Sequence, residues 1–438
     1  MKFHIIFLML SLMAFSTNAF SSYVIYIKNN TGICQKEHSG EIIKQDENPG
    51  KLIHYCLDQL KERNGGKLTI AAGSYKIDQS LLIGENIQIN GDGNATKLIF
   101  SGSKKGEGGL IIKDADGIKI FNISVLNEEG NVDAGIIVDN SGSCNIKDVK
   151  VIGFEKYGIW LRNNTFLSTI DGCTVAGNLV SNIFLDSLAK DGRFGDFIPN
   201  TVTNSMIFGG GKGIETRRAI VANIIGCSIY QTKDIGIHLH STSNSVLVSG
   251  CRTFQISNHA VLIEDTHELN VSGNIFCWHT GHGIIVRNAS WGTISGNEFI
   301  DNGSYNPGVK NNSLTFQEVN MDDYELKNGI LLQNVIGYHV GGNAIFNWPV
   351  CPKMKYGIEE DEYSINNTIS GNNINYYELE PVKSNGKGTV VENNRGLGEI
   401  PYVSLQRRED RTLIDFTPKI IQSFETELTE KYIKLLSE

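Results

Sequence analysis

The chain has 438 residues, a formal net charge of −9 and eight cysteines. The acidic balance argues against nucleic acid as the partner, because binding to phosphate requires a surplus of lysine and arginine. It also argues against a broad membrane-binding surface, but it leaves an anionic substrate open, since a groove can carry its own sign of charge.

The first 19 residues have the features of a secretory signal peptide. Met1-Lys2 is a short basic start, the stretch from Ile5 to Phe15 is apolar, and Thr17-Asn18-Ala19 is a small-residue cleavage site. The apolar stretch is shorter than the roughly 20 residues that a membrane span needs. We therefore expect residues 1–19 to be removed and the mature protein to be secreted, either to the periplasm or outside the cell, without a membrane segment.

Residues 20–66 are predicted to form an N-terminal segment that ends in a capping helix. Apolar side chains recur at helical spacing within residues 46–63, and these are Leu52, Ile53, Cys56, Leu57 and Leu60. Asn64-Gly65-Gly66 then ends the helix. The stacked coils that follow have an open apolar end, which this helix is expected to cover.

Residues 67–395 carry an internal repeat with a period of about 20–30 residues, which is typical of solenoids. One phrase reads Gly-Ile plus three further residues, and its clearest copies start at Gly158, Gly236, Gly283 and Gly329. A second phrase, Ser-Gly-Asn or Gly-Gly-Asn, ends at Asn274, Asn297, Asn343 and Asn372. We expect one β coil per repeat, so that a single solenoid replaces the two or three globular domains that the length suggests.

Three cysteines occupy the position that these asparagines hold in other coils, and they are Cys173, Cys227 and Cys251. The position follows a turn glycine and is expected to point inward. Cysteine there is a small buried apolar residue, whereas asparagine would form hydrogen bonds along a stacked ladder. We expect free thiols, with a disulfide between Cys227 and Cys251 left open on Cα spacing.

Side chains alternate across a strand, so each coil has inward and outward positions. If the residue after the repeated glycine points inward, two outward columns follow. The first outward column reads Trp160, Phe184, Glu215, His238, Leu262, Ile285 and Leu331, and the second reads Arg162, Asp186, Arg217, His240, Glu264, Arg287 and Gln333.

The second outward column contains no apolar residue. Arginine and histidine interleaved with acids are suited to holding anionic sugars, because a guanidinium binds a carboxylate through two hydrogen bonds. We interpret Arg162, Asp186 and the neighbouring His238 as substrate contacts. Trp160 and Phe184 are expected to be exposed and to stack on sugar rings. The alternative is a surface salt-bridge ladder whose pairs contribute less than about 1 kcal/mol each.

Two insertions interrupt the period, from Ser187 to Asn200 and from Asp301 to Asn328. Insertions in solenoids often lie on the binding side, which makes Asp322 and Asp323 candidates for substrate contact. The tail, residues 396–438, is predicted to carry a helix from Thr417 to Glu438 that covers the C-terminal end, with Pro418 in its first turn.

The capping helix, Gly-Gly-Lys-Leu-Thr-Ile at 65–70, Gly-Ser-Tyr-Lys-Ile at 73–77 and the Ser-Gly-Asn coils together resemble the pectate-lyase-like superfamily. The resemblance implies an all-β fold, a single-stranded right-handed parallel β-helix with an N-terminal capping helix and a C-terminal helix. It also implies carbohydrate as the substrate class. Gly281-His282-Gly283 is similar to the Gly-His-Gly motif of polygalacturonases, which makes His282 a candidate for substrate contact. The other polygalacturonase motifs are absent, and only Asp234 stands where one acid of the pair could lie.

Coil spacing favours a lyase over a hydrolase. Asp186 and Glu264 are three coils apart, about 14 Å at the usual strand spacing, whereas a hydrolase needs two carboxyl groups about 5–10 Å apart. A lyase acting on uronates needs a cation for the sugar carboxylate, a base for the C5 proton and an acid for the leaving oxygen. We assign Arg217 and Arg287 to the carboxylate, His240 to the base or acid, and Glu264 to orientation or metal binding.

The sequence therefore predicts a secreted polysaccharide-degrading enzyme, a lyase for a uronate-containing glycan. A glycoside hydrolase or fructotransferase-type glycosidase on the same fold is one alternative, and a non-catalytic glycan-binding or adhesin-like protein is another. Ca²⁺ is a candidate cofactor, with Glu264, Asp265 and Asp186 as hard oxygen ligands. The oligomeric state is left open between monomer and homotrimer.

Overall fold

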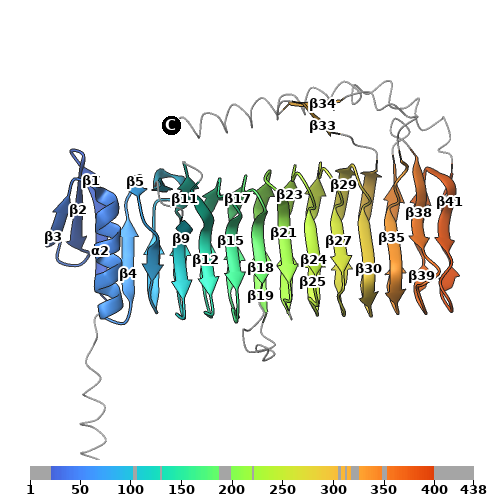
Figure 1. Cartoon of the computed structure of the whole chain (residues 1–438), viewed down its shortest axis with the longest axis horizontal. Coiled ribbons are helices and arrows are strands. Elements are labelled where there is room, and N and C mark those ends of the chain that lie inside the picture. The colour runs from blue at the N-terminus through green and yellow to red at the C-terminus, as the bar shows by residue number, and fades with distance from the viewer. Residues whose placement is uncertain are drawn as a thin grey trace, which may run out of the picture.

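The computed structural model describes residues 21–101, 106–128, 131–186, 199–219, 221–303, 307–310, 313–316, 325–347 and 353–398. The predicted signal peptide and the predicted C-terminal helix lie outside these ranges, as do Asp322 and Asp323. Figure 1 shows the coils stacked side by side along the long axis, with α2 and its neighbouring strands at one end and β41 at the other. No helix in the described ranges is long and apolar enough to cross a bilayer.

The N-terminal end is covered by a helix and a small antiparallel sheet. Helix α2, Pro49–Glu62, begins at the cap residue Asn48, whose side chain accepts a hydrogen bond of 3.0 Å from the backbone N–H of Gly50. Its buried face carries the five apolar residues that the spacing predicted. Three strands that were not predicted from the sequence precede the helix, β1 Ser22–Lys28, β2 Thr31–Lys36 and β3 Ile42–Asp46. Strand β1 also pairs in parallel with β4, Gly66–Ile70, so this sheet continues directly into the solenoid.

Three parallel sheets, here called A, B and C, form the solenoid, and each coil supplies one strand to each sheet. Sheet A continues from β4 through β7 Ile87–Asn90, β10 Lys119–Phe121, β13 Asn145–Lys147, β16 Thr169–Asp171, β19 Asn200–Thr203, β22 Ala222–Ile225, β25 Val246–Ser249, β28 Asn270–Ser272, β31 Thr293–Ser295, β36 His339–Gly341, β39 Thr368–Ser370 and β42 Val390–Glu392.

Sheet B contains β5 Gly73–Ile77, β8 Thr96–Phe100, β11 Ser124–Asn127, β14 Lys150–Ile152, β17 Thr174–Ala176, β20 Met206–Phe208, β23 Ser228–Tyr230, β26 Arg252–Phe254, β29 Ile275–His279, β32 Glu298–Asn302, β37 Ala344–Phe346 and β40 Asn373–Asn375. A short 3-10 helix, Gly93–Ala95, precedes β8, and the second insertion contains an antiparallel hairpin of β33 Pro307–Lys310 and β34 Ser313–Phe316.

Sheet C contains β6 Leu81–Ile83, β9 Gly106–Lys113, β12 Val132–Asp139, β15 Tyr157–Arg162, β18 Ser181–Asp186, β21 Lys212–Arg217, β24 Ile237–His240, β27 Val261–Glu264, β30 Ile284–Ser290, β35 Ile330–Ile336, β38 Met354–Glu360 and β41 Tyr377–Ser384. The repeated Gly-Ile phrase lies on this sheet. The predicted inward residues, such as Ile159, Ile237 and Ile284, are fully buried in the core. The predicted alternation is therefore confirmed.

A ladder of asparagine side chains runs through the turns between sheets A and B, as predicted. Asn274, Asn297, Asn343, Asn372 and Asn394 are joined in order by hydrogen bonds from each Nδ2 to the next Oδ1, at 2.8–3.0 Å. Each asparagine Oδ1 also accepts the backbone N–H of the preceding coil, for example that of Asn274 on Asn297 at 3.0 Å. The turn needs positive φ just before the ladder, and Gly273 and Gly296 supply it at 65° and 62°.

Cysteines replace the asparagines in the earlier coils without a disulfide. Cys173, Cys227 and Cys251 are buried free thiols, each 1% exposed. Cys251 joins the two halves of the column, because its backbone N–H donates to Asn274 Oδ1 at 2.8 Å. These thiols fill space in the core, as the sequence predicted.

Replacing Asn297 by alanine tests the ladder. The change leaves the backbone N–H and the Nδ2 of Asn274 without their acceptor and Val271 O without its donor. Because each buried polar group left unpaired costs about 1–3 kcal/mol, Asn297→Ala should lower the free energy of unfolding by about 3 kcal/mol or more. Urea-induced unfolding measures this loss. The control is Asn270→Ala, an exposed position on β28, and equal midpoints for the two variants would contradict the ladder's role.

Candidate functional site

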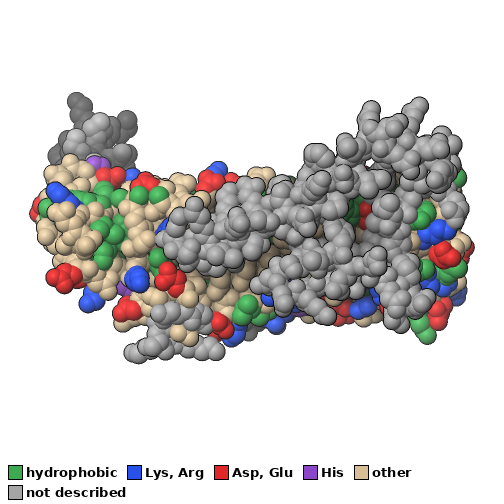
Figure 2. All heavy atoms as spheres, turned by 90° about the horizontal axis from the view of Figure 1, so that it is seen from above, with side chains coloured by type: hydrophobic (Ala, Val, Ile, Leu, Met, Phe, Trp, Pro, Cys, Tyr) green, Lys and Arg blue, Asp and Glu red, His purple; other side chains and the backbone are tan. Residues whose placement is uncertain are grey.

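The candidate site lies on the outer face of sheet C, where the two predicted outward columns stand. The strand register aligns Arg162 with Asp186, Asp186 with Arg217, and Arg217 with His240. It continues to Glu264, Arg287 and Gln333 in the same way. Both columns are therefore confirmed coil by coil. Figure 2, which views the whole molecule from above and not this face, shows acidic and basic side chains interspersed towards the two ends of the described surface.

At the centre of this face, two histidines and two glutamates form one connected group, here called the histidine–glutamate cluster: Glu215, His238, His240 and Glu264. His240 Nε2 lies 3.0 Å from Glu215 Oε1, and His238 Nε2 lies 3.1 Å from Glu264 Oε2. The two imidazole rings are stacked, with their centroids 4.2 Å apart. The cluster thus consists of two histidine–carboxylate pairs placed side by side.

Two further side chains fix the central carboxylate. Lys212 Nζ donates a hydrogen bond of 2.8 Å to Glu215 Oε1, and Ser181 Oγ donates to Glu215 Oε2. On the other side, His240 Nδ1 lies 2.8 Å from Ser241 Oγ. Every polar atom of Glu215 and His240 is therefore held by a neighbour, which restricts their rotamers.

The environment sets the protonation of the cluster. Burial opposes the charged form of Glu215, but hydrogen bonds from His240, Lys212 and Ser181 together outweigh it and lower its pKa to about 2. Burial, with the nearby charges of His240 and Lys212, lowers the pKa of His238 to about 4. Burial also opposes charge on Glu264, yet the contacts with His238 and Arg287 lower its pKa. At neutral pH Glu215 and Glu264 are thus ionised and His238 is neutral.

Arginines flank the cluster, and each is paired with an acid. Arg217 and Arg218 both contact the carboxylate of Asp186, the latter at 3.1 Å. Arg287 Nη1 lies 3.2 Å from Glu264 Oε1, and its Nε donates to Gln333 Oε1 at 2.7 Å. Arg217 and Arg287 remain 39% and 42% exposed. The face therefore contains a salt-bridge ladder whose central arginines still reach solvent.

Arg162 forms the outer end of this series. Its Nε and Nη2 donate to Asp139 Oδ2 at 2.9 and 2.8 Å, and its Nη1 contacts Glu107. The guanidinium also lies over the Trp160 ring, 4.6 Å from the ring centroid. Arg162 is thus held in place by two acids and an aromatic face.

An aromatic group lies next to the cluster. Tyr157 contacts both Trp160 and Phe184, with ring centroids 4.8 and 5.0 Å apart. Phe184, which we expected to be exposed, is only 2% exposed, because the Tyr157 and Trp160 rings and the Arg217 guanidinium pack against it. Trp160 keeps partial exposure, so it is the ring of this pair that can face a sugar.

His282 lies apart from the cluster, and its hydrogen bonds involve backbone N–H groups. The ring Nδ1 of His282 accepts a hydrogen bond of 2.9 Å from the backbone N–H of Asn328. The backbone N–H of His282 donates to the ring Nδ1 of His259 at 3.0 Å. Burial lowers the pKa of His282 to about 3. Asp234, the other residue compared with polygalacturonases, accepts a hydrogen bond from Asn258. The geometry thus gives His282 a structural task at the turn before β30.

One set of residues has metal-binding geometry. Among the described side chains, Glu215, His238 and His240 form a group of three whose ligand atoms all lie within 4.8 Å of one another. The oxygen donors considered for Ca²⁺ are engaged elsewhere: Asp186 with two arginines, Glu264 with His238 and Arg287, and Asp265 with Asn288.

Glu215 stands in the first outward column, but it was not among the site residues predicted from the sequence. Its importance follows from a diagonal contact, because a residue in a sheet also meets the neighbour two positions along the adjacent strand. Glu215 is paired directly with His238, so His240 is that diagonal neighbour. The same rule would have placed the two side chains within reach of each other, although their rotamers decide whether they meet. Lys212, Ser181 and Tyr157, which precede the columns on their strands, were also missed.

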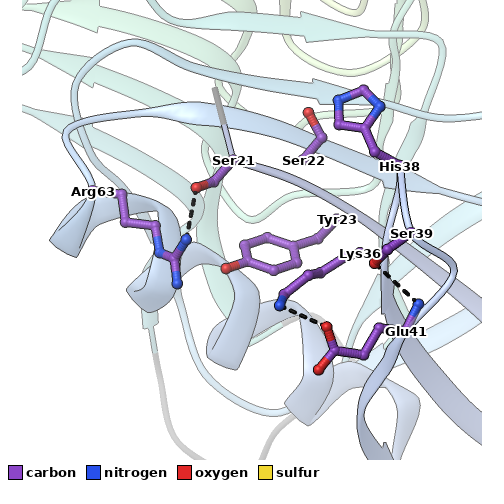
Figure 3. Close-up of a pocket in the computed structure, with 8 residues that line it drawn as sticks. All are labelled: Ser21, Ser22, Tyr23, Lys36, His38, Ser39, Glu41 and Arg63. Atoms are coloured by element: carbon purple, nitrogen blue, oxygen red, sulfur yellow. Dashed lines mark hydrogen bonds and ion pairs between the residues drawn. The ribbon is translucent and has the colours of Figure 1, made fainter. Parts of the chain in front are cut away.

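A separate cavity of about 410 Å³ lies at the N-terminal end, near β1, β2 and the end of α2. Figure 3 shows that its charged side chains already have partners, Lys36 with Glu41 and Arg63 with Ser21. It lacks a grouping of acids and histidines like that on sheet C. The sheet C face is therefore the stronger candidate.

Comparison with known proteins identifies the architecture. The family model described as "right handed beta helix region" matches residues 134–314. No protein of curated function matches the sequence. Several solved structures share the fold at low sequence identity.

One is the A-module of the Azotobacter vinelandii mannuronan C-5 epimerase AlgE6, with a TM-score of 0.64 and 14% identity over 81% of this chain and 96% of that chain. Another is the tailspike protein of the E. coli bacteriophage HK620 in complex with a pentasaccharide, with a TM-score of 0.55 and 12% identity over 81% of this chain and 79% of that chain. A third is the DFA-IIIase from Arthrobacter chlorophenolicus in complex with GF2, with a TM-score of 0.53 and 15% identity over 73% of this chain and 89% of that chain. The chain therefore has a right-handed parallel β-helix fold, as the residues of its coils predicted.

Proposed function

We propose that this protein is an exported polysaccharide lyase that cleaves a uronate-containing glycan on the outer face of sheet C. The observation that carries the proposal is the histidine–glutamate cluster, which lies between the exposed arginines Arg217 and Arg287. Proton-transfer groups and cations for a sugar carboxylate thus stand within one strip, which is the combination that elimination on a uronate requires.

In the proposed reaction, a base takes the C5 proton, the C4–C5 double bond forms, and the C4–O4 bond breaks as the leaving oxygen gains a proton. Charge that develops on the sugar carboxylate is stabilised by guanidinium groups, which donate hydrogen bonds in a fork. Arg217 and Arg287 are suited to this task because both reach solvent. The proton transfers come from the cluster, whose two histidine–carboxylate pairs provide an acid and a base a few ångströms apart.

Structural neighbours support a glycan as the substrate class. One is an epimerase that acts at C5 of mannuronan, and others were solved with a pentasaccharide or with GF2. Epimerisation at C5 and elimination begin with the same step, removal of the C5 proton, so a shared fold is compatible with either outcome. Trp160, partly exposed beside the strip, would contact a sugar ring.

Hydrolysis is the second candidate, since Glu215 and Glu264 stand two coils apart, about 10 Å along the solenoid. That separation is near the range of inverting glycosidases. Hydrolysis is disfavoured because each of the two carboxylates is already within hydrogen-bond distance of a histidine. A non-catalytic protein that only binds glycans is a further alternative, and the salt-bridge ladder is the feature that favours it.

A panel of uronans incubated with the protein tests the reaction. We expect ultraviolet absorbance from the unsaturated ends that elimination creates. Glu215→Gln and His240→Ala should each lower kcat by about 100-fold or more, which is typical for loss of a proton-transfer group. His339→Ala, an exposed histidine on β36 of sheet A, is the control and should keep full activity.

Four results would redirect the proposal. New reducing ends without absorbance would indicate a hydrolase, and incorporation of solvent deuterium at C5 without cleavage would indicate an epimerase. Binding without any product would indicate a recognition protein. Full turnover by His240→Ala, with the variant folded by circular dichroism, would exclude the cluster as the catalytic centre.

Recognition of the sugar carboxylate can be tested through Arg287. Arg287→Ala should raise KM for the uronan by about 10–100-fold, the range expected for a hydrogen bond to a charged group. Arg252→Ala, an exposed arginine on β26 of sheet B, is the matched control. On the same glycan with its carboxyl groups reduced to alcohols, wild type and Arg287→Ala should have similar KM values. An equal penalty on both glycans would show that Arg287 does not bind the carboxylate.

A further inference from the structure

We propose that Glu215, His238 and His240 bind one divalent first-row transition metal ion. A ligand atom from each residue lies within 4.8 Å of the others. The atoms that face one another are Glu215 Oε1, His240 Nε2 at 3.0 Å from it, and His238 Nδ1 at 4.0 Å from it. Ligands bonded to one metal at about 2.0–2.2 Å lie about 3–4 Å apart, so small side-chain rotations close the site.

The kind of ligand selects the kind of metal. Two imidazole nitrogens and one carboxylate are the protein ligands of many zinc sites that keep a position open, and of facial sites for other first-row metals. Ca²⁺ and Mg²⁺ prefer sets made of oxygen. The cluster is therefore suited to Zn²⁺ or Co²⁺ rather than to Ca²⁺.

The outer contacts orient all three ligands. The second ring nitrogen of His238 faces Glu264 at 3.1 Å, and that of His240 faces Ser241 at 2.8 Å. The second oxygen of Glu215 accepts a hydrogen bond from Ser181. Metal-binding histidines and carboxylates usually have such partners on their far atoms, because these contacts fix the ring orientation and the tautomer. Each ligand is thus left with one atom directed at the common centre.

His238 provides a second, independent observation. The residue is only 8% exposed, and its Nδ1 is buried without a hydrogen-bond partner. A buried ring nitrogen without a partner is uncommon, because polar groups in protein interiors are almost always paired. A metal ion between His238, His240 and Glu215 would give this nitrogen its missing contact.

Lys212 occupies part of this space in the structure. Its ammonium group donates to Glu215 Oε1 at 2.8 Å and so places a positive charge next to the oxygen that would ligate the metal. The side chain is 19% exposed. A lysine with a long flexible stem can rotate toward solvent, so the metal and Lys212 compete for Glu215. This competition predicts that removal of the ammonium strengthens metal binding.

Metal binding would change the task of the histidines in the proposed lyase. His238 and His240 would act as ligands, and the ion would add a positive charge beside Arg217 and Arg287 for the sugar carboxylate. Loss of turnover in His240→Ala fits either role, so activity alone does not separate them. The metal site itself does not depend on the glycan proposal and is measurable without any glycan.

The test uses the whole mature chain, free of any affinity tag and treated with a chelator before dialysis. Titration with Co²⁺ should give visible absorption bands that saturate at one ion per chain, and Zn²⁺ should abolish them. Ca²⁺ at the same concentration should leave the spectrum unchanged. Calorimetric titration with Zn²⁺ gives the affinity.

Variants assign the ion to the site. Glu215→Gln and His238→Ala should weaken Zn²⁺ binding by more than about 100-fold, beyond the 10–100-fold typical of lost outer contacts. Lys212→Ala should bind Zn²⁺ more tightly than wild type, and His339→Ala should bind equally well. Circular dichroism and thermal unfolding establish that each variant is folded.

Two outcomes would overturn the inference. One is the absence of binding in both wild type and Lys212→Ala, and the other is binding that survives in Glu215→Gln and His238→Ala. A wild type that cleaves uronan but binds no metal would refute the metal site and leave the lyase standing. A wild type that binds the metal but acts on no uronan would refute the lyase and leave the metal site standing.

Discussion

The parallel pairing of one coil on the next is the interaction on which the rest of the molecule depends. Hydrogen bonds between backbones fix the register, so equivalent residues stand above one another about 4.8 Å apart. On sheet C the pairing Arg217 with His240 and His240 with Glu264 is a consequence of that register alone. The buried isoleucine columns and the asparagine ladder hold the coils at this spacing from within. The site is thus assembled by stacking rather than by the folding of loops.

Because the strand register places the site residues, part of the site could be predicted from the sequence. The repeated glycine and the alternation of side chains were enough to place Arg162, Asp186 and His240 in one outward column, because register converts a repeat into neighbours. Exposure was harder to predict. Phe184 is outward but buried, since Trp160, its neighbour in the same column, and Tyr157 and Arg217, which lie outside that column, all pack against its ring.

The contact that organises the cluster was also beyond column reasoning. Glu215 meets His240 diagonally, and the final pairing depends on side-chain rotamers that a repeat does not encode. The strands β1 to β3 were missed for a related reason, because they lie ahead of the repeat and pair antiparallel. By contrast, α2 was predictable from its own helical spacing and its cap. Local patterns and repeats were readable in the sequence, whereas lateral contacts were not.

The register also means that the neighbours on this face change when a whole coil is gained or lost, and not when single residues are inserted in a turn. Glu264 and Arg287 contact each other across 23 positions of the sequence, and Arg287 and Gln333 do so across 46, because the second insertion lies between the latter two. Lengthening a turn therefore leaves the neighbours unchanged. Deleting one complete coil would instead shift every later residue by one step and bring new side chains beside Glu215. Duplication or loss of whole coils offers this fold a direct route to new combinations of acid, histidine and arginine.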